Sequence, residues 1–359
     1  MSKRLVDVFC QMVKIDSESG NEKPFLDYLV ELFRNELGAF CVFNSFGNLI
    51  ARVPAKNCSG KPTILFGCHG DTVKPGKGIE PVIIDDIIRS KGDTILGADD
   101  KAGITELYEA ILTADHHPEL EIVITREEET GLMGARNLDI AEMKASMGFV
   151  LDGDKINSIV IGGPSHMIID VEITGKAAHA GMEPEKGISA IRAASHAISI
   201  IKEGWVDSET TCNVGIIEGG RIRNGVPEKA SIKAECRSLN HDTCIAYSNT
   251  VKEAFEVSAR AIGAVADVKL DLAYKAVRIS DDSSVLIAAR KAFEKTGLTP
   301  ETRIVCGGTD ASILNGKGIP TVVLGIGCRA EHSNDEHIYI SEMETMVKVL
   351  HNLFEVLCD

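Results

Sequence analysis

Residues 63–71 read Thr-Ile-Leu-Phe-Gly-Cys-His-Gly-Asp, a fully apolar run of strand length that ends in His69 and Asp71. A short apolar run with this boundary is typical of a buried strand in an α/β sheet. In open α/β sheets, ligands bind beyond the carboxyl ends of the strands. The stretch therefore predicts a buried strand that delivers a histidine and a carboxylate to a functional site.

The sequence on both sides of this strand alternates between helical and strand-like patterns. Apolar residues recur at helical spacing in residues 3–15 and 22–37, and residues 101–113 continue that pattern with Asp99 or Asp100 as the expected N-cap. Strand-like runs cover residues 40–43, 48–53, 121–125 and 148–151. This alternation predicts an α/β domain whose central, mostly parallel sheet is flanked by helices.

The middle of the chain has a different order of elements. Residues 165–272 read β-α-β-β-α-β, which is typical of a small α+β domain. Helix and strand patterns then alternate again, with helices at 281–295 and 341–356 and a strand at 319–324. We therefore expect one α/β domain, residues 1–164 with 273–359, interrupted by an inserted α+β domain at 165–272.

Composition limits the function classes. The 359 residues carry a net charge of −15, which disfavours nucleic acid and anionic membranes as partners. No apolar run approaches the roughly 18 residues of a membrane helix, and the first residues lack a signal-peptide pattern. The ten cysteines form no Cys-x-x-Cys pair, so we expect reduced, mostly buried thiols and a cytoplasmic protein.

Histidines and carboxylates gather where the predicted strands end. One such group alone has an ordinary explanation: a structural histidine, an acidic helix start or a solvated acidic run. Five in succession favour a metal site, and imidazole with carboxylate oxygen suits Zn²⁺, Mn²⁺ or Co²⁺ better than Ca²⁺. The groups are His69 with Asp71, Asp99 with Asp100, Glu127 to Glu129, Asp152 with Asp154, and Glu331 to His337.

These motifs, in this order, resemble the M20 family of two-metal zinc peptidases and amidohydrolases, and most of all its peptidase T (tripeptide aminopeptidase) branch. The resemblance runs through nearly the whole chain. It implies a catalytic α/β domain interrupted by a lid and dimerisation domain, which agrees with the boundaries expected above. The motifs are His69-x-Asp71, Gly97-Ala-Asp99-Asp100-Lys-Ala-Gly103, Glu128-Glu129-Thr-Gly131, Leu151-Asp152-Gly153 and Glu331-His332.

Carried over by position, the resemblance assigns a role to each residue of these motifs. His69 and Asp152 bind one metal ion, Glu129 and His332 bind the other, and Asp99 bridges the two. Asp71 orients His69, and Glu128 is the general base that activates a water molecule. Two cations held in this way can polarise a carbonyl group and lower the pKa of water.

The inserted domain adds further matches. His179, in Gly175-Lys-Ala-Ala-His179-Ala-Gly181, resembles a lid histidine that stabilises the oxyanion in the partner subunit's site, which implies a homodimer. Asn224 and Arg237 match substrate-contacting positions, as does the loop with Gly307 and Gly308. The alternatives are a surface histidine, an ordinary ion pair and a tight turn.

The resemblance implies an aminopeptidase that acts on short peptides. An M20-type amidohydrolase (deacylase) or carboxypeptidase would use the same metals, and a non-catalytic metal- or peptide-binding protein is a third possibility. Glu128 favours catalysis, because a closed structural site needs no free base beside it. The chain is shorter than typical members of the branch, and Cys306 stands where they carry arginine, so peptide length and side-chain preference stay open.

Overall fold

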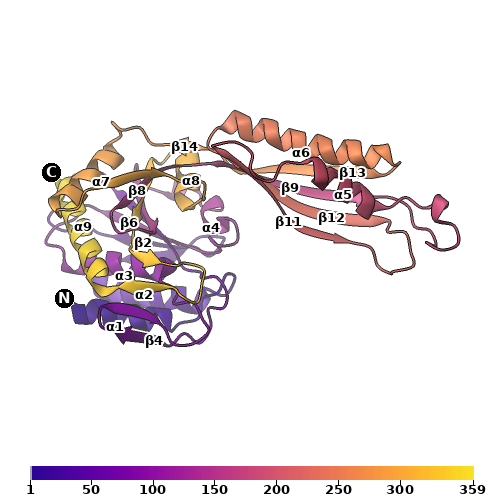
Figure 1. Cartoon of the computed structure of the whole chain (residues 1–359). Coiled ribbons are helices and arrows are strands. Elements are labelled where there is room, and N and C mark those ends of the chain that lie inside the picture. The colour runs from indigo at the N-terminus through magenta and orange to yellow at the C-terminus, as the bar shows by residue number, and fades with distance from the viewer. Residues whose placement is uncertain (1) are drawn as a thin grey trace. The chain divides into compact units, whose positions relative to one another are not determined.

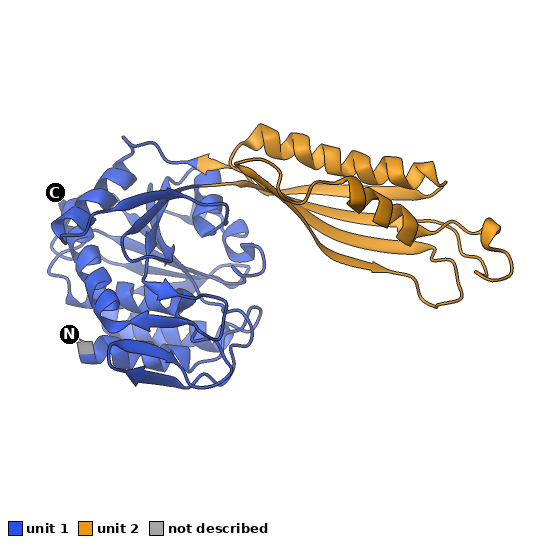
Figure 2. Cartoon of the chain, viewed as in Figure 1, with its two compact units in different colours: residues 1–162, 278–359 blue, residues 163–277 orange. Residues whose placement is uncertain are grey.

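The structure is a computed structural model that describes residues 2–359. The chain divides into two compact units, Met1–Gly162 with Arg278–Asp359 and Gly163–Val277 (Figure 2). The insertion predicted at residues 165–272 falls within the bounds of the second unit.

The main sheet has nine strands in the order β1-β2-β6-β3-β7-β16-β8-β14, and β15 pairs with β8. Its centre, β6-β3-β7-β16, is parallel, whereas β1, β2 and β8 join it antiparallel. The predicted α/β class is confirmed, and the sheet is mixed because its flanks turn antiparallel. The strands are β1 (Phe40–Phe43), β2 (Leu49–Val53), β3 (Ile64–His69), β6 (Leu120–Thr125), β7 (Gly148–Gly153), β8 (Ser158–Gly163), β14 (Val277–Arg278), β15 (Glu301–Ile304) and β16 (Thr321–Gly325).

Helices cover this sheet on both faces. All six residues of β3 are buried, and since side chains alternate along a strand, both of its faces must be covered. Helices α3 and α8 both contact β3 and β7, and α3 also packs on α1 and α9. The helices of this unit are α1 (Ser2–Val13), α2 (Lys23–Leu37), α3 (Ala98–Thr113), α4 (Met133–Arg136), η1 (Ile140–Glu142), α7 (Ser284–Lys295), α8 (Asp310–Gly316) and α9 (Ile340–Cys358).

The second unit is an antiparallel sheet in the order β10-β11-β12-β9-β13, with α5 and α6 on one face (Figure 1). Burial alternates along β9, where Met167, Ile169, Val171 and Ile173 point into the core beneath the helices. The predicted β-α-β-β-α-β order is present, with the two-residue β10 added. The elements are β9 (Ser165–Thr174), η2 (Pro184–Lys186), α5 (Ala190–Ile200), β10 (Gly204–Trp205), β11 (Thr210–Gly219), β12 (Lys229–Ser238), α6 (His241–Ala261) and β13 (Val265–Tyr274).

A small antiparallel sheet joins segments that lie far apart in the sequence. Its order is β17-β18-β5-β4, so residues 81–90 pair with residues 328–339. The last two strands of the chain are thereby fixed beside the loop that precedes α3. The strands are β4 (Pro81–Ile84), β5 (Ile87–Ser90), β17 (Cys328–Arg329) and β18 (His337–Tyr339).

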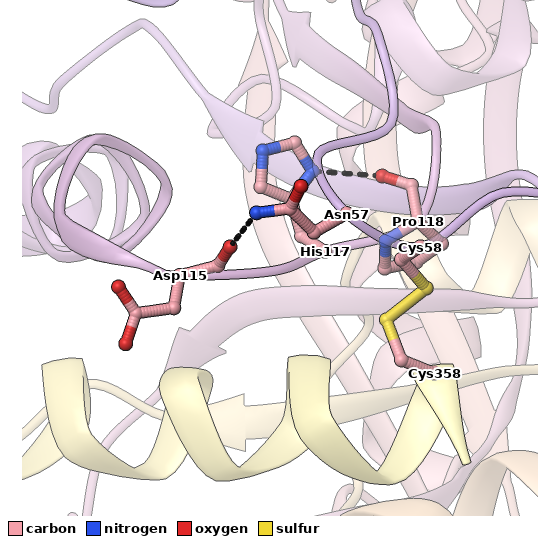
Figure 3. Close-up of a disulfide and its surroundings, with 6 residues drawn as sticks. All are labelled: Asn57, Cys58, Asp115, His117, Pro118 and Cys358. Atoms are coloured by element: carbon pink, nitrogen blue, oxygen red, sulfur yellow. Dashed lines mark hydrogen bonds between the residues drawn. A yellow bond between two sulfur atoms is a disulfide. The ribbon is translucent and has the colours of Figure 1, made fainter.

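The prediction of reduced cysteines is wrong for one pair. Cys58 and Cys358 form a disulfide with a Cα–Cα distance of 5.7 Å, and the other eight cysteines are free (Figure 3). The two residues are 300 positions apart in the sequence, so no local motif indicates their pairing. Beside the bond, the side chain of Asn57 donates to the carbonyl of Asp115 at 2.8 Å. In residues 2–359 we find no helix with the length and apolar character to cross a membrane.

Candidate metal centre and active site

The parallel strands deliver the predicted ligands to one edge of the main sheet. In a parallel sheet the carboxyl ends of neighbouring strands lie side by side. His69 is the last residue of β3, Asp152 lies at the end of β7, and Glu129 follows β6. His332 lies between β17 and β18, beyond the end of β16. The order β6-β3-β7-β16 therefore sets these side chains next to one another.

Asp99 reaches this edge from an irregular start of α3. Gly97 has a left-handed backbone with φ of 72°, Asp99 and Asp100 have non-helical dihedrals, and the peptide bond between them is cis. The N-cap expected at Asp99 or Asp100 is wrong for both residues, because the N-cap of α3 is Gly97. Oδ2 of Asp100 instead accepts the backbone N–H of His69 at 3.0 Å. The irregular backbone leaves the Asp99 carboxylate facing the strand ends.

The two oxygens of Asp99 face two different histidines. Its Oδ1 lies 3.0 Å from Nε2 of His69, and its Oδ2 lies 3.3 Å from Nε2 of His332. Nε2 of His69 is also 3.7 Å from Oδ1 of Asp152, and Nε2 of His332 is 2.9 Å from Oε1 of Glu129. Ligand atoms thus gather in two groups, His69–Asp99–Asp152 and Asp99–Glu129–His332, with Asp99 in both.

The chemistry of these two groups fits two divalent cations. Each group offers imidazole nitrogen and carboxylate oxygen from three residues, and three protein ligands leave a coordination position for a reactant. Hydrogen bonds from its imidazole to the carboxylates of Asp99 and Glu129 raise the pKa of His332 to about 11. Burial and the charge of Asp99 raise the pKa of Asp152 well above its usual value. The raised pKa values show that the charges of the carboxylates in the two groups favour protonation, which adds positive charge. A bound cation would supply the same positive charge.

The carboxylate of Asp71 holds the loop that carries Glu128 and Glu129. Its Oδ1 accepts the N–H of Glu128 at 2.9 Å, and its Oδ2 accepts the N–H of Glu129 at 3.2 Å and the hydroxyl of Ser19 at 2.7 Å. Toward His69, the nearer acceptor is the Asp71 backbone carbonyl, 2.9 Å from Nδ1, while Oδ1 is 3.5 Å away. Asp71 therefore contacts both His69 and the loop that carries Glu128 and Glu129.

Glu128 lies beside the ligand groups without belonging to either. It is 9% exposed, and burial together with the charge of Asp152 raises the pKa of its carboxyl group well above the usual value. Glu127, the residue before it, has φ of 54°, a left-handed backbone that is uncommon for a residue with a side chain. A buried carboxyl group with a raised pKa is suited to accept a proton near neutral pH.

Comparison with known proteins places the chain in a family. A sequence profile described as a peptidase dimerisation domain matches residues 165–262, and the profile of peptidase family M28 matches residues 48–183. YqjE of Bacillus subtilis, an uncharacterised protein, is 39% identical over 354 residues that cover 95% of each chain. The crystal structure of aminopeptidase PepT from Bacillus cereus matches with 39% identity and a TM-score of 0.89, over 100% of this chain and 99% of that one.

The chain belongs to the M20 peptidase family. A tripeptidase structure from Staphylococcus aureus matches with 32% identity and a TM-score of 0.93, again over 100% of this chain and 99% of the other. Both solved relatives are similar over their whole length, so this M20 chain lies in the peptidase T-like branch. The resemblance found in the sequence is therefore confirmed at the level of family and branch.

Asp310 is a residue of this M20 site that sequence analysis missed. It begins α8 directly after the Gly307–Gly308 loop and is buried, and its Oδ2 accepts the hydroxyl of Thr125 at 2.5 Å. Burial raises the pKa of Asp310 to about 6, although the Thr125 hydrogen bond lowers it. Thr125 ends β6, so this hydrogen bond links the end of the glycine loop to the start of the loop with Glu128. The signal that could have indicated it is the sequence Gly307-Gly308-Thr309-Asp310, in which Asp310 closely follows the two glycines.

The predicted residues of the inserted unit fall at two places. His179 and Asn224 are exposed and line one cavity of about 730 Å³, and the N–H of Ala180 donates to the carbonyl of Asn224 at 2.9 Å. Arg237 lies on β12 six residues beyond Ser231, which also lines that cavity, so it is roughly 20 Å from the cavity at 3.3 Å per residue. Its guanidinium pairs with Glu235 at 3.1 Å. The structure therefore groups His179 with Asn224 but not with Arg237.

Proposed function

We propose that this chain is a metal-dependent aminopeptidase that removes the first residue of short peptides, tripeptides above all. The observation that carries the proposal is the carboxylate of Asp99, whose two oxygens face two separate ligand groups beside the buried Glu128. The similarity to a PepT aminopeptidase and to a tripeptidase supports the choice of substrate.

The ligand assignment follows the two groups. His69 and Asp152 would hold one ion, Glu129 and His332 the other, and Asp99 both. Zn²⁺ suits this mixture of imidazole and carboxylate, and Mn²⁺ or Co²⁺ would also fit. When bound, two such ions supply Lewis-acid polarisation of the peptide carbonyl and a low pKa for water.

The protein's own groups would move the proton and orient the reactants. Glu128 takes a proton from the attacking water and passes it to the leaving amine, which its burial and raised pKa favour. Asp71 holds the backbone N–H groups of Glu128 and Glu129, so base and ligand keep a fixed spacing. Gly307 and Gly308 would allow close approach of the substrate backbone.

We also propose a homodimer formed through the inserted unit, which matches the dimerisation profile at residues 165–262. His179 would act from the partner subunit, where it stabilises the developing oxyanion, and Asn224 and Arg237 would contact the substrate. A cytoplasmic location is a further proposal, supported by the eight free cysteines and opposed by the Cys58–Cys358 disulfide.

The test is a paired assay of the zinc-loaded protein with an unblocked tripeptide and its N-acetylated twin, with products identified by mass. An aminopeptidase releases the first residue of the free peptide alone. Processing of the acetylated twin would instead indicate a deacylase or a carboxypeptidase with the same metal chemistry. If neither peptide changes while two metal ions are bound, a non-catalytic binding protein remains.

A further inference from the structure

Glu336 is a buried carboxylate to which the sequence motifs assign no role, although it lies within the group from Glu331 to His337. It is 1% exposed and lies in the loop between β17 and β18, four residues after His332. It belongs to neither group of candidate metal ligands. A buried carboxylate is costly unless hydrogen bonds satisfy it, so its partners should reveal why it is there.

The partners of Glu336 are backbone amides of the loop that carries Asp99. Its Oε2 accepts the N–H groups of Leu96 and Gly97, each at 2.8 Å. Its Oε1 accepts the N–H of Asp99 at 3.0 Å and faces the Sγ of Cys328 at 3.5 Å. One side chain thus satisfies three amides in four consecutive residues, across about 240 positions of sequence.

The same residue is fixed to the loop of His332. The N–H of Glu336 donates to the carbonyl of Ser333 at 3.1 Å, and the hydroxyl of Ser333 donates to the carbonyl of Ala330 at 2.7 Å. His332 itself has φ of 61° in this turn. Glu336 therefore connects the turn that presents His332 to the backbone that presents Asp99.

We infer that Glu336 is a positioning residue that sets the spacing between Asp99 and His332 and so forms the metal site they share. The inference rests on the proposed function only for its effect on catalysis, because the hydrogen bonds themselves are independent of any reaction. Residues that orient metal ligands in this way typically contribute about 10- to 100-fold to metal affinity or activity.

The substitution Glu336→Gln isolates this role. Glutamine has the size of glutamate but offers a carbonyl on one side and an amide donor on the other. Whichever way it lies, a donor faces a backbone N–H, so at least one bond to the Asp99 loop is lost. We expect the Co²⁺ and Zn²⁺ affinity of the Asp99–Glu129–His332 site to fall about 10- to 100-fold. We also expect kcat to fall by a larger factor than KM rises.

Glu121 provides a matched control. It is also fully buried, and its Oε2 accepts the N–H groups of Lys144 and Ala145 at 2.9 and 3.1 Å. It lies at the start of β6, whereas the candidate ligands follow the end of that strand. Because Oε1 of Glu121 also accepts from the guanidinium of Arg52 at 2.9 Å, Glu121→Gln should lose at least as much stability yet keep the metal affinity of the wild type.

The experiment titrates the metal-free full chain with Co²⁺, follows absorption and metal content, and records unfolding midpoints and tripeptide kinetics. Equal metal affinities for Glu336→Gln and wild type, or equal losses in Glu336→Gln and Glu121→Gln, would overturn the inference. If Glu336→Gln does not fold, Glu336→Asp with Glu121→Asp gives the same comparison. If wild type cleaves no peptide while Glu336→Gln still loses metal affinity, the proposed function fails and the inference holds.

Discussion

At the scale of single residues, the candidate site combines left-handed backbone conformations with closely spaced charged groups. His332 has a left-handed backbone and a side chain that is 55% exposed, yet it faces two carboxylates. Glu127 also has a left-handed backbone, directly before the buried Glu128. Such backbone conformations cost free energy, so they persist only where the surrounding structure compensates for that cost. They cluster at functional sites.

Replacing Glu128 separates catalysis from metal binding. Glu128→Gln keeps the size of the side chain and removes the proton acceptor, so we expect kcat to fall about 10²- to 10⁴-fold. Metal content should stay at the wild-type level, because Glu128 belongs to neither ligand group. The check is tripeptide turnover together with elemental analysis of the same sample.

Glu127→Gln is the control for this substitution, because it changes the adjacent carboxylate, which also lies outside the ligand groups. It should retain most of its activity. Wild-type turnover in Glu128→Gln would show that another group accepts the proton, and Asp310 would then be the first alternative.

In the inserted unit, the ion pairs of Glu235 make the stability of the fold depend on pH. Nε2 of His166 lies 2.9 Å and the guanidinium of Arg237 lies 3.1 Å from its Oε2. These partners lower the pKa of Glu235 to about 2. Because the folded pKa is below the unfolded value, the stabilisation is present above about pH 4.3. It is lost as the pH falls toward 2.

We therefore expect Glu235→Gln to lower the melting temperature at pH 7, and we expect the difference from wild type to shrink below about pH 4 and to vanish near pH 2. The side chain is 36% exposed, so the difference at pH 7 should stay near 1 kcal/mol. Melting curves of both proteins from pH 2 to 7 test this, with the exposed Glu185→Gln as control. A constant difference across that range would contradict the ion-pair explanation.

At the scale of elements, the parallel strand order explains why much of the site could be predicted. Apolar runs mark β3, β6, β7 and β16, and parallel strands end at a common edge, so their terminal residues must meet. The regular periodicity of the helices likewise marks α2, α7 and α9 within a few residues. Element type and ligand position both follow from patterns that repeat along the chain.

The features that could not be predicted depend on contacts without a repeating pattern. The hydrogen bonds from Glu336 to the Asp99 loop join one side chain to distant backbone amides, which no sequence spacing indicates. The backbone between Gly97 and Asp100 departs from helix geometry, and the sequence pattern, which resembles an ordinary N-cap followed by a helix, does not indicate this departure. Pairing of β5 with β18 is equally distant in sequence.

Helix α3 and strand β7 pack so closely that one glycine decides their spacing. A Cβ on Gly103 would lie 2.3 Å from Oδ1 of Asp100 and 2.6 Å from the carbonyl oxygen of Leu151. Leu151 immediately precedes Asp152, so Gly103→Ala must displace α3, β7 or both. We expect a loss of about 1–3 kcal/mol in the free energy of unfolding and weaker metal binding.

Gly316, the last residue of α8, serves as the comparison, because a Cβ there meets nothing within 4 Å. Gly316→Ala should leave metal binding unchanged and keep or slightly raise stability. Urea unfolding and metal titration of the two variants test the packing argument. Wild-type stability and metal affinity in Gly103→Ala would show that α3 can move without cost.

At the scale of the whole molecule, the Cys58–Cys358 disulfide joins two distant parts of the chain at a place far from the candidate site. Cys58 follows β2, whose last residue Val53 pairs with Leu120 at the start of β6. The candidate ligands follow the opposite ends of the parallel strands. The bond therefore ties the last turn of α9 to the edge of the sheet that carries no candidate ligand.

Reduction of this bond should lower stability and leave catalysis unchanged. The cross-link joins residues 300 positions apart, and constraining so long a loop in the unfolded chain stabilises the fold by up to about 5 kcal/mol. We expect dithiothreitol to lower the urea midpoint of wild type but not that of Cys358→Ser, with equal kcat throughout. In urea without reductant, wild type should titrate eight thiols. A count of ten thiols, or a wild-type urea midpoint that does not change with reductant, would contradict a stabilising disulfide. A fall in kcat on reduction would mean that the two edges of the sheet are coupled.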